Sequence, residues 1–340
     1  MTPSTPLRGL AVLALAAAAA PVLVITPAQA HTGAASAASS PDSVRYAWVK
    51  SCPKKDYTIP CGRWTLTMRS GKTIKLTDAR VNPENANGKV DKDGAALFAI
   101  SGDGRFVNYF KGDKLVVRDV NSGKVRPLPG KAATLPKGLG MNEVDTTISH
   151  DGSIVVVDYY DEAGTLPSLV ADMRTGKVVK LSAANNVLSF SATGTHLLTS
   201  RFTDDNTTEF AVFDTDGHKT ASQVVPQIVS NNAPVALADD GNTVAVIVTG
   251  ASRKHRLHTY DLAADTVSDP VALGIPRNEN AQRLFWDSAG ALTLWTSRDD
   301  ENENPVFAVK RTVNAETGAA RKVDSYKVRG GTWTWWLPGE

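Results

Sequence analysis

Short hydrophobic runs alternate with polar turns along most of this chain. A representative run is residues 153–160 (SIVVVDYY), in which β-branched and aromatic side chains dominate. Such runs favour β-strands, and the turns between them commonly end in glycine, which accepts the positive φ of tight hairpins. The pattern therefore predicts an all-β protein built from short antiparallel strands.

One turn, with the hydrophobic runs on either side of it, recurs five times at a nearly constant spacing. Its copies read LFAISGDGRFV (97–107), TTISHDGSIV (146–155), SFSATGTHL (189–197), VALADDGNTV (235–244) and LFWDSAGALTL (284–294). The glycines of successive turns are 42 to 49 residues apart. A repeat of this length that contains several strands is typical of a β-propeller, in which each repeat forms one four-stranded blade.

The repeats predict six blades, although only five copies are complete. An additional half-copy at residues 63–74, together with the run at 44–49, supplies three strands that lack an innermost partner. The missing strand is at the other end of the chain, because residues 332–337 (TWTWWL) resemble the first strand of a repeat. We expect this C-terminal strand to complete the N-terminal blade and to close the ring, which leaves no open sheet edge. Trp333, Trp335 and Trp336 would then seal the junction, with alternate side chains facing opposite sheets.

Two turn motifs resemble those of the TolB-like and WD40-like families of exported six-bladed β-propellers. The matching residues are the S-x-D-G turns at 101–104 and 149–152 and the D-x-x-[ST]-G-K turns at 119–124 and 172–177. The resemblance covers residues 44–340 and implies the fold, but no particular activity, because many functions share this fold. The chain lacks the separate N-terminal α/β domain of TolB. It also lacks the Gly-His and Trp-Asp dipeptide motifs that characterise true WD40 repeats. A role in envelope import is therefore not transferred.

The N-terminal residues 1–30 have the organisation of a signal peptide. Arg8 supplies a positive segment, an apolar stretch follows, and residues 28–30 (AQA) fit the small-x-small cleavage rule. The alternative is an uncleaved membrane anchor, but Pro21 splits the apolar stretch and no positive cluster follows it. We expect cleavage, a secreted extracellular protein without stable membrane insertion, a flexible leader at residues 31–43, and one β-propeller domain at residues 44–340.

Charge and cysteine content narrow the classes of partner. The formal net charge is +2 and falls to +1 when Arg8 is removed with the signal peptide, which argues against a nucleic-acid partner. The two cysteines are Cys52 and Cys61, and in an exported chain a disulfide between them is expected. They have no C-x-x-C spacing and no nearby histidine for a redox or zinc site. We expect a structural disulfide and a monomeric protein.

Polar residues in the loops between blades are the first candidates for a binding site. In a propeller of this strand order, these loops and the loops between second and third strands emerge on one face, and here they are the long ones. The candidate ligand-binding residues at the channel mouth on this face are Asn142, Glu143, Asp145, Asn186, Asn232 and Asn280. Because Ca²⁺ prefers oxygen ligands, Asp145, Asn186 and Asn232 are the candidate metal ligands, by analogy with lactonase-type six-bladed propellers. The alternative is that asparagine is simply common in loops, where it tolerates left-handed turns.

Aromatic residues late in the second strands are the other candidates. They are Tyr109, Phe110, Tyr159, Tyr160 and Phe202. Near the long-loop face they would form a platform for a peptide or a glycan, whereas the alternative, packing between blades, is expected for at least one member of each pair.

The favoured function is a non-enzymatic secreted β-propeller that binds a protein or peptide partner on its long-loop face. Two alternatives remain open: a metal-assisted hydrolase or lactonase-like enzyme with its site at the channel mouth, and a cell-wall glycan binder. The chain has no G-x-S-x-G motif, phosphate loop or dinucleotide fingerprint. No catalytic residue is assigned, and Ca²⁺ is the one cofactor considered.

Overall fold

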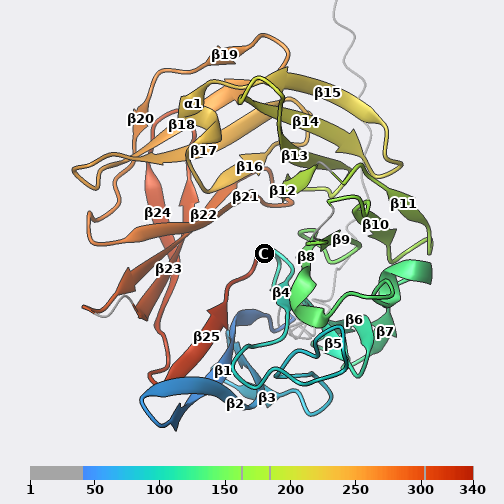
Figure 1. Ribbon diagram of the computed structural model, residues 1–340. Helices are drawn as coiled ribbons and strands as arrows, with labels where there is room; N and C mark the ends of the chain where they lie inside the picture. Colours follow the sequence, from blue (N-terminus) through green and yellow to red (C-terminus); the bar gives the residue numbers. More distant parts are fainter. Residues whose placement is uncertain (1–40, 162–163, 184, 302–303, 340) are drawn as a thin grey trace, which may run out of the picture. The chain divides into compact units, whose positions relative to one another are not determined.

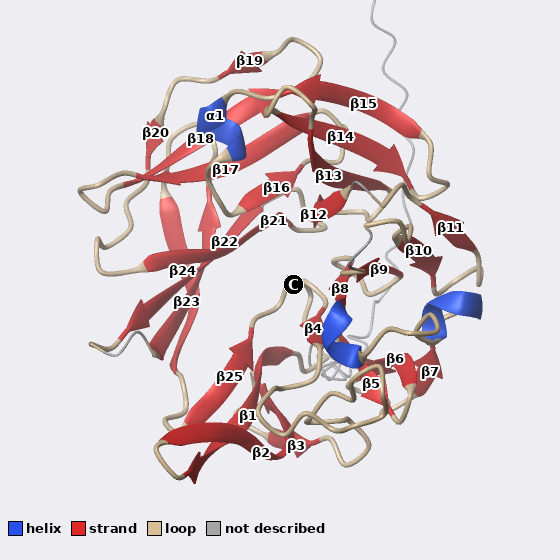
Figure 2. Cartoon of the chain, in the orientation of Figure 1, coloured by secondary structure: helices blue, strands red, loops and turns tan. Residues whose placement is uncertain are grey.

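Six antiparallel sheets are arranged in a ring (Figure 1), and side chains of their innermost strands line a central channel. The computed structural model describes residues 41–161, 164–183, 185–301 and 304–339. The predicted signal peptide and residues 31–40 of the predicted leader lie outside these described residues. The ring confirms the prediction of a six-bladed β-propeller, and strands make up nearly all of its regular structure (Figure 2).

Blades 2 to 4 take their strands in chain order from the channel outward. Blade 2 contains β4 (Phe98–Ile100), β5 (Phe106–Lys111), β6 (Lys114–Asp119) and β7 (Val125–Pro127). Blade 3 contains β8 (Val144–Ile148), β9 (Ile154–Tyr159), β10 (Leu169–Asp172) and β11 (Val178–Lys180). Blade 4 contains β12 (Asn186–Phe190), β13 (His196–Phe202), β14 (Thr208–Asp214) and β15 (Lys219–Val224).

Blades 5 and 6 follow the same order. Blade 5 contains β16 (Val235–Leu237), β17 (Thr243–Thr249), β18 (His255–Asp261) and an outer edge divided into β19 (Thr266–Val267) and β20 (Val271–Ala272). Blade 6 contains β21 (Asn280–Trp286), β22 (Leu292–Asp299), β23 (Pro305–Val313) and β24 (Ala320–Lys327). The outer edge of blade 5 is divided at Pro270, which has no N–H to donate to a ladder.

Blade 1 joins the two ends of the described chain. It contains β1 (Val44–Lys54), β2 (Tyr57–Met68), β3 (Thr73–Lys75) and the C-terminal strand β25 (Thr332–Trp336), in the order β25-β1-β2-β3. Strand β25 pairs antiparallel with β1, with Ala47 opposite Trp336 and Val49 opposite Thr334. The prediction that the C-terminal strand closes the N-terminal blade is therefore confirmed.

The core of the described protein consists of six apolar clusters, one between each pair of neighbouring blades. Alternation along the strands supplies both sides of a blade. In β25, Trp335 packs into the cluster between blades 6 and 1, whereas Trp336 packs into the cluster between blades 1 and 2. These adjacent tryptophans thus face opposite sheets, as predicted.

The recurring turn glycines serve two purposes. All five have positive φ, between 66° and 74°. Four of them also lie against the preceding blade. A Cβ on Gly152, for example, would lie 2.5 Å from the Phe106 ring, whereas one on Gly290 would meet nothing within 4 Å. Glycine is therefore required at Gly152 by both backbone conformation and close approach.

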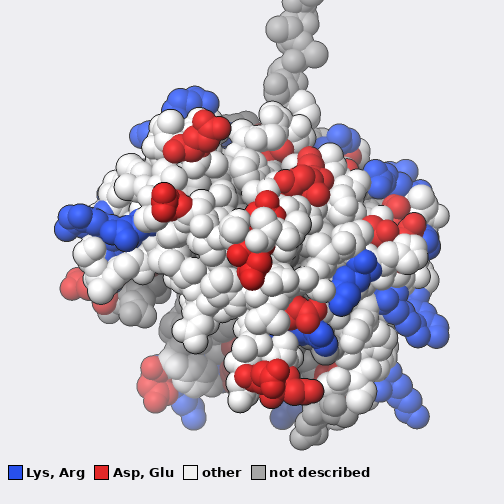
Figure 3. All heavy atoms as spheres, turned by 90° about the horizontal axis from the view of Figure 1, so that it is seen from above, with Lys and Arg blue, Asp and Glu red and all other residues white. Residues whose placement is uncertain are grey.

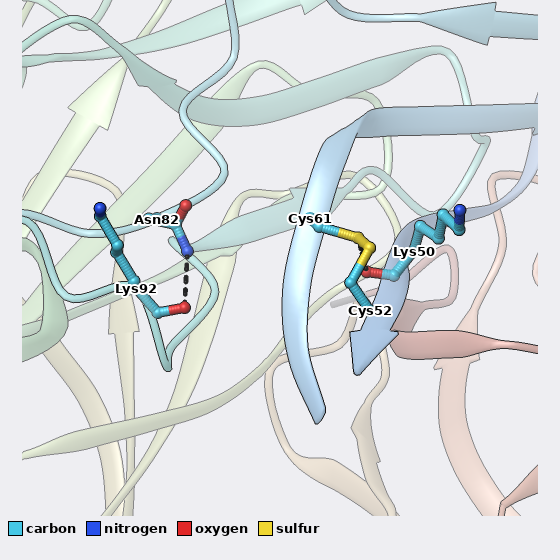
Figure 4. Close-up of a disulfide and its surroundings, with 5 residues drawn as sticks. All are labelled: Lys50, Cys52, Cys61, Asn82 and Lys92. Carbon is cyan, nitrogen blue, oxygen red and sulfur yellow. Dashed lines mark hydrogen bonds between the residues drawn. A yellow bond between two sulfur atoms is a disulfide. The ribbon is translucent and has the colours of Figure 1, made fainter. Parts of the chain in front are cut away.

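Cys52 and Cys61 form the expected disulfide, which links the two strands of the β1–β2 hairpin (Figure 4). Their Cα atoms are 5.9 Å apart, and the Lys50 carbonyl oxygen lies 3.4 Å from the Cys61 Sγ. The disulfide thus staples blade 1 at the end of the hairpin away from β3.

Short helical turns lie in the loops between blades. They are η1 (Gly130–Ala133), η2 (Met141–Glu143) and α1 (Gln227–Ser230). Across the described ranges, no helix combines the length and apolar character needed to cross a bilayer.

Candidate functional site

The strand order places two sets of loops at one end of the ring, which we call the long-loop face. They are the loops that enter each innermost strand and the loops between the second and third strands. Among the second set, blades 1 and 2 have tight two-residue turns, whereas blades 3 to 6 have connections of five residues or more. The opposite end, the Gly-turn face, carries the recurring glycines. The longer loops of the second set therefore lie on blades 3 to 6.

A cavity of about 300 Å³ occupies the centre of the ring. Its wall is contributed mainly by the innermost strands β8, β12 and β21, by the segment entering β16, and by the C-terminal residues Trp336 and Gly339. The wall is polar and apolar in similar measure, and Asp145, His150 and Arg283 are the charged or titratable side chains among the described residues that line it. Ligand sites are usually concave and mostly apolar with a few placed polar groups, and this cavity is more polar than that.

Two interactions cross the channel between blades 3 and 6, which lie opposite each other in the ring. Nearer the long-loop face, Asp145 of β8 and Arg283 of β21 interact electrostatically. At the Gly-turn end, the rings of His150 and Phe285 are 5.6 Å apart. The channel therefore has a charged layer nearer the long-loop face and an aromatic layer nearer the Gly-turn face.

The C-terminal residues narrow the channel at its Gly-turn end. The Gly339 N–H donates to the Ile100 carbonyl oxygen at 3.0 Å, and a Cβ on Gly339 would lie 2.7 Å from the Phe285 ring. The end of the chain thus touches blades 2 and 6 after leaving blade 1. Together with the His150–Phe285 contact, it leaves the long-loop face as the more open entrance.

Two carboxylates stand side by side near that entrance. Asp145 on β8 is directly opposite Asp158 on β9, so their side chains share one face of blade 3. The Tyr160 hydroxyl donates to Asp145 Oδ2 at 3.4 Å. We call Asp145 and Asp158 the carboxylate pair.

Burial sets the protonation of this pair. Burial raises the pKa of Asp158 to about 6, and the neighbouring Asp145 adds to the rise, while a hydrogen bond from Ser168 opposes it. Burial also raises the pKa of Asp145, against the lowering effects of the Thr146 N–H, the Tyr160 hydroxyl and Arg283. Perturbed carboxylates beside a cavity are typical of functional sites, although structural groups also show them.

Of the six residues predicted to bind ligand, the structure places only Asp145 in the cavity wall. Glu143 caps η2, because its Oε2 accepts from the Gly140 N–H at 2.6 Å. The Asn232 amide donates to the Ile228 carbonyl oxygen at 3.0 Å, and the Asn280 amide donates to Asp299 Oδ2 at 2.7 Å. Asn142, in the middle of η2, and Asn186, at the start of β12, are both exposed.

The predicted metal ligands Asp145, Asn186 and Asn232 are therefore not gathered around the cavity, and Ca²⁺ binding stays a prediction. Within the described ranges, no group of three or more His, Cys, Asp or Glu side chains is arranged to hold a metal ion. The candidate set thus reduces to Asp145 and the groups around it.

Sequence reasoning missed Arg283, Asp158 and the inward position of His150. Asp158 interrupts the apolar run at 153–160, and this interruption could have identified it, whereas Arg283 comes just before the apolar residues 284–286 and no local signal marks it. His150 lies in the turn at 149–152 on the Gly-turn face, and its ring lines the Gly-turn end of the channel.

Large apolar side chains are exposed at the long-loop end of blades 3 to 5. Phe202 at the end of β13 is 81% exposed and Tyr160, after β9, is 60% exposed. Leu188 and Ile228 are also exposed, and Leu188 lines the cavity. We call these four residues the apolar rim.

Of the five aromatic residues predicted to form a binding platform, three are buried or packed between blades, and the platform itself stays a prediction. Tyr109 and Phe110 are fully buried in the clusters on the two sides of blade 2, and Tyr159 packs against the cluster between blades 2 and 3. Only Tyr160 and Phe202 of the five reach solvent as large exposed side chains.

Charge is mixed over the side of the ring that Figure 3 shows, where basic and acidic side chains are interspersed among uncoloured ones. On the long-loop face, the loops that carry the apolar rim also carry Asp161, Asp204 and Asp205. The surroundings of the rim on blades 3 and 4 are therefore acidic.

The fold defines this protein as a six-bladed β-propeller closed by its C-terminal strand. No protein-family model matches the chain, and no curated protein matches its sequence. Among solved structures, the chain is similar to a putative TolB from Agrobacterium tumefaciens, with 12% identity, a TM-score of 0.46, and coverage of 74% of this chain and 91% of that one.

Two further solved structures have similar sequence identities and TM-scores. TolB from Acinetobacter baumannii has 13% identity and a TM-score of 0.44, and the match spans 82% of this chain and 65% of that chain's length. The Cps50 (Swd1) β-propeller domain from Myceliophteria thermophila has 12% identity and a TM-score of 0.41, with 68% and 71% coverage. The assignment of the fold rests on the strand pairings described above.

Proposed function

We propose that this protein is an exported, non-enzymatic β-propeller that binds a protein or peptide partner on its long-loop face, over blades 3 and 4. The observation that carries the proposal is the exposure of Phe202 and Tyr160 at the long-loop end of blades 3 and 4, where the Tyr160 hydroxyl donates to Asp145 of the cavity wall. Exposed aromatic side chains of this size are favoured anchors in protein interfaces. Loops on a rigid scaffold are the usual carriers of binding.

The charges around the apolar rim support a basic partner. Asp161, Asp204 and Asp205 lie on the loops of blades 3 and 4, next to Tyr160 and Phe202 in the chain. The nearby Arg201 is already paired with Glu209, at 2.7 Å between Nη2 and Oε2. A segment that presents apolar and basic side chains would complement this surface.

The proposed location of the protein is outside the cytoplasm. Residues 1–30 carry the pattern of a cleaved signal peptide, and the Cys52–Cys61 disulfide is of the kind that persists in oxidising compartments. Both support an extracellular protein that meets its partner outside the cytoplasm. The metal-assisted hydrolase and the cell-wall glycan binder stay predictions, because neither is favoured by a specific observation.

A capture experiment tests the proposal. The purified protein would serve as bait for the secreted and envelope proteins of the cells that produce it, alongside a Tyr160→Ser/Phe202→Ser double variant. A Val323→Ser variant is the matched control, because Val323 is 49% exposed but lies on the outer strand β24. We expect the double variant to weaken capture of a specific partner by roughly ten- to a hundredfold, and the control to retain it. Equal capture by all three proteins would contradict the proposal.

A further inference from the structure

The central cavity has one negative and one positive group on opposite walls. Asp145 on β8 and Arg283 on β21 both line it, and both residues are partly exposed. The two groups interact electrostatically, but within the described residues no Arg283 nitrogen lies within 4.0 Å of an Asp145 carboxylate oxygen. The two charges therefore face each other across the cavity without forming a direct ion pair.

The protein uses only part of the hydrogen-bonding capacity of the Asp145 carboxylate. The Thr146 N–H donates to Oδ1 at 2.8 Å, and the Tyr160 hydroxyl donates to Oδ2 at 3.4 Å. An ionised carboxylate offers about four acceptor sites, so Asp145 can accept further bonds from a donor in the cavity. On the other wall, Arg283 Nη1 donates to the Gln282 carbonyl oxygen at 3.3 Å, which helps to orient the guanidinium group. A guanidinium group has the planar fork of donors that suits a carboxylate.

Burial disfavours both of these charges. It raises the pKa of Asp145 and lowers the pKa of Arg283 to about 10, and in each case the other group is among the effects that oppose the shift. A ligand charge of opposite sign beside each group would offset the cost of burial. A zwitterion supplies both charges in one molecule and leaves the net charge of the cavity unchanged.

The Gly-turn end of the cavity offers an aromatic surface. Phe190, Phe285 and Trp336 line the cavity at the Gly-turn ends of their strands. Phe285 follows Arg283 by two residues on β21, so the charged and aromatic surfaces are about 7 Å apart along this strand. The cavity volume of about 300 Å³ is at the small end of the range of ligand pockets. The cavity therefore suits one small molecule with a charged head and a large apolar side chain.

We propose that the central cavity binds a free α-amino acid with an aromatic or large apolar side chain. Arg283 binds the carboxylate of the ligand and Asp145 binds its ammonium group. The ligand side chain packs toward the Gly-turn end, against Phe285 and Trp336. The ligand enters from the long-loop face, which is the more open entrance. This site goes beyond the proposed function and requires no protein partner.

Isothermal titration calorimetry of the purified protein with L-phenylalanine at pH 7.5 tests the proposal. Three further probes each lack one part of that molecule: hydrocinnamate lacks the ammonium group, phenethylamine lacks the carboxylate, and glycine lacks the aromatic side chain. We expect saturable binding of L-phenylalanine, and at least about tenfold weaker binding of each other probe. Each of them leaves a buried charge or the aromatic surface without its partner.

Two variants separate the roles of the two charges. Asp145→Asn should weaken the binding of L-phenylalanine about tenfold or more, but should bind hydrocinnamate at least as tightly as the wild type does. Arg283→Gln should weaken the binding of L-phenylalanine by a similar factor, but should bind phenethylamine at least as tightly as the wild type does. Asp205→Asn, which changes an exposed carboxylate on the long-loop face, is the matched control and should bind all four probes normally.

The proposal would be overturned by a lack of saturable L-phenylalanine binding, or by binding no tighter than that of the two singly charged probes. Wild-type affinity for L-phenylalanine in both charge variants would also overturn it. If a variant fails to fold, the comparison of the four probes on the wild-type protein decides. Phe202 does not line the cavity. Failure of amino-acid binding with partner capture intact would therefore refute this site alone, and the reverse result would refute the proposed function alone.

Discussion

At the scale of single residues, surroundings decide how the carboxylates of this protein titrate. The turn residue Asp261 accepts hydrogen bonds from the Ala264 and Ala263 N–H groups and from the Asn242 amide, and these bonds lower its pKa. Asp158 lies between blades 3 and 4 with few such donors, and burial raises its pKa to about 6. Asp261 therefore stabilises its turn when it is ionised, whereas the ionisation of Asp158 lowers the stability of the folded protein.

That cost predicts a pH-dependent effect of Asp158→Asn on stability. Because the pKa of Asp158 is raised on folding, from an ordinary value of 3.8 to about 6, its ionisation destabilises the folded state, and the penalty grows between these two pH values and is complete above them. Asparagine removes the penalty, so the variant should gain about 1–2 kcal/mol relative to the wild type between pH 4.5 and pH 7.5. Urea unfolding at both pH values measures this, with Asp205→Asn as the exposed control. An equal difference at both pH values would contradict the assignment.

The turn glycines permit a matched comparison of two variants. Gly152→Ala and Gly290→Ala both place alanine at positive φ, 71° and 74° respectively, which costs about 1–2 kcal/mol in each. Only at Gly152 would the new methyl group also meet the Phe106 ring, which adds about 1–3 kcal/mol. Chemical denaturation should therefore show that Gly152→Ala is the more destabilising. Equal losses would mean that close packing between blades 2 and 3 does not constrain this turn.

At the scale of elements, strand β25 holds the ring closed. Beyond its pairing with β1, the junction between blades 6 and 1 includes the Arg45–Asp324 ion pair at 3.0 Å and the Tyr46–Tyr326 stack at 5.0 Å between ring centroids. Trp335 and Trp336 fill the clusters on the two sides of blade 1. The closure is thus a packing junction as well as a hydrogen-bonded one.

Deletion of residues 332–339 should therefore lower the free energy of unfolding by more than about 4 kcal/mol, because it removes two packed tryptophans and exposes the edge of β1. Thermal unfolding followed by circular dichroism measures the loss. Thr332→Ala, a change at the start of the same strand, is the mild control. A truncated protein that melts with the wild type would refute closure by β25.

At the scale of the whole molecule, the ring is predictable because each blade is specified by its own local turns. The glycine spacing, the half-copy at residues 63–74 and the C-terminal run at 332–337 together indicate six blades. The cysteine pair is equally local, since both residues lie in one hairpin.

The candidate site is less predictable because it depends on contacts between distant blades. Asp145 and Arg283 meet across the channel from opposite blades, and nothing local in the sequence relates them. Some of the asparagines predicted to converge there instead form hydrogen bonds within their own loop or blade, as Asn232 and Asn280 do. The exposure of Phe202 and the burial of Phe110 likewise depend on where each second strand ends relative to its neighbouring blade.

The central claim is that a partner binds the long-loop face over blades 3 and 4. Site-specific photo-crosslinking tests it most directly, with p-benzoylphenylalanine in place of Phe202 and, in a second protein, in place of Val323 on the outer strand β24. On exposure to the secreted and envelope proteins of the producing cells, the probe at position 202 should crosslink one specific partner, and the probe at position 323 should not. Crosslinking of the same partner from position 323 but not from position 202 would contradict the account.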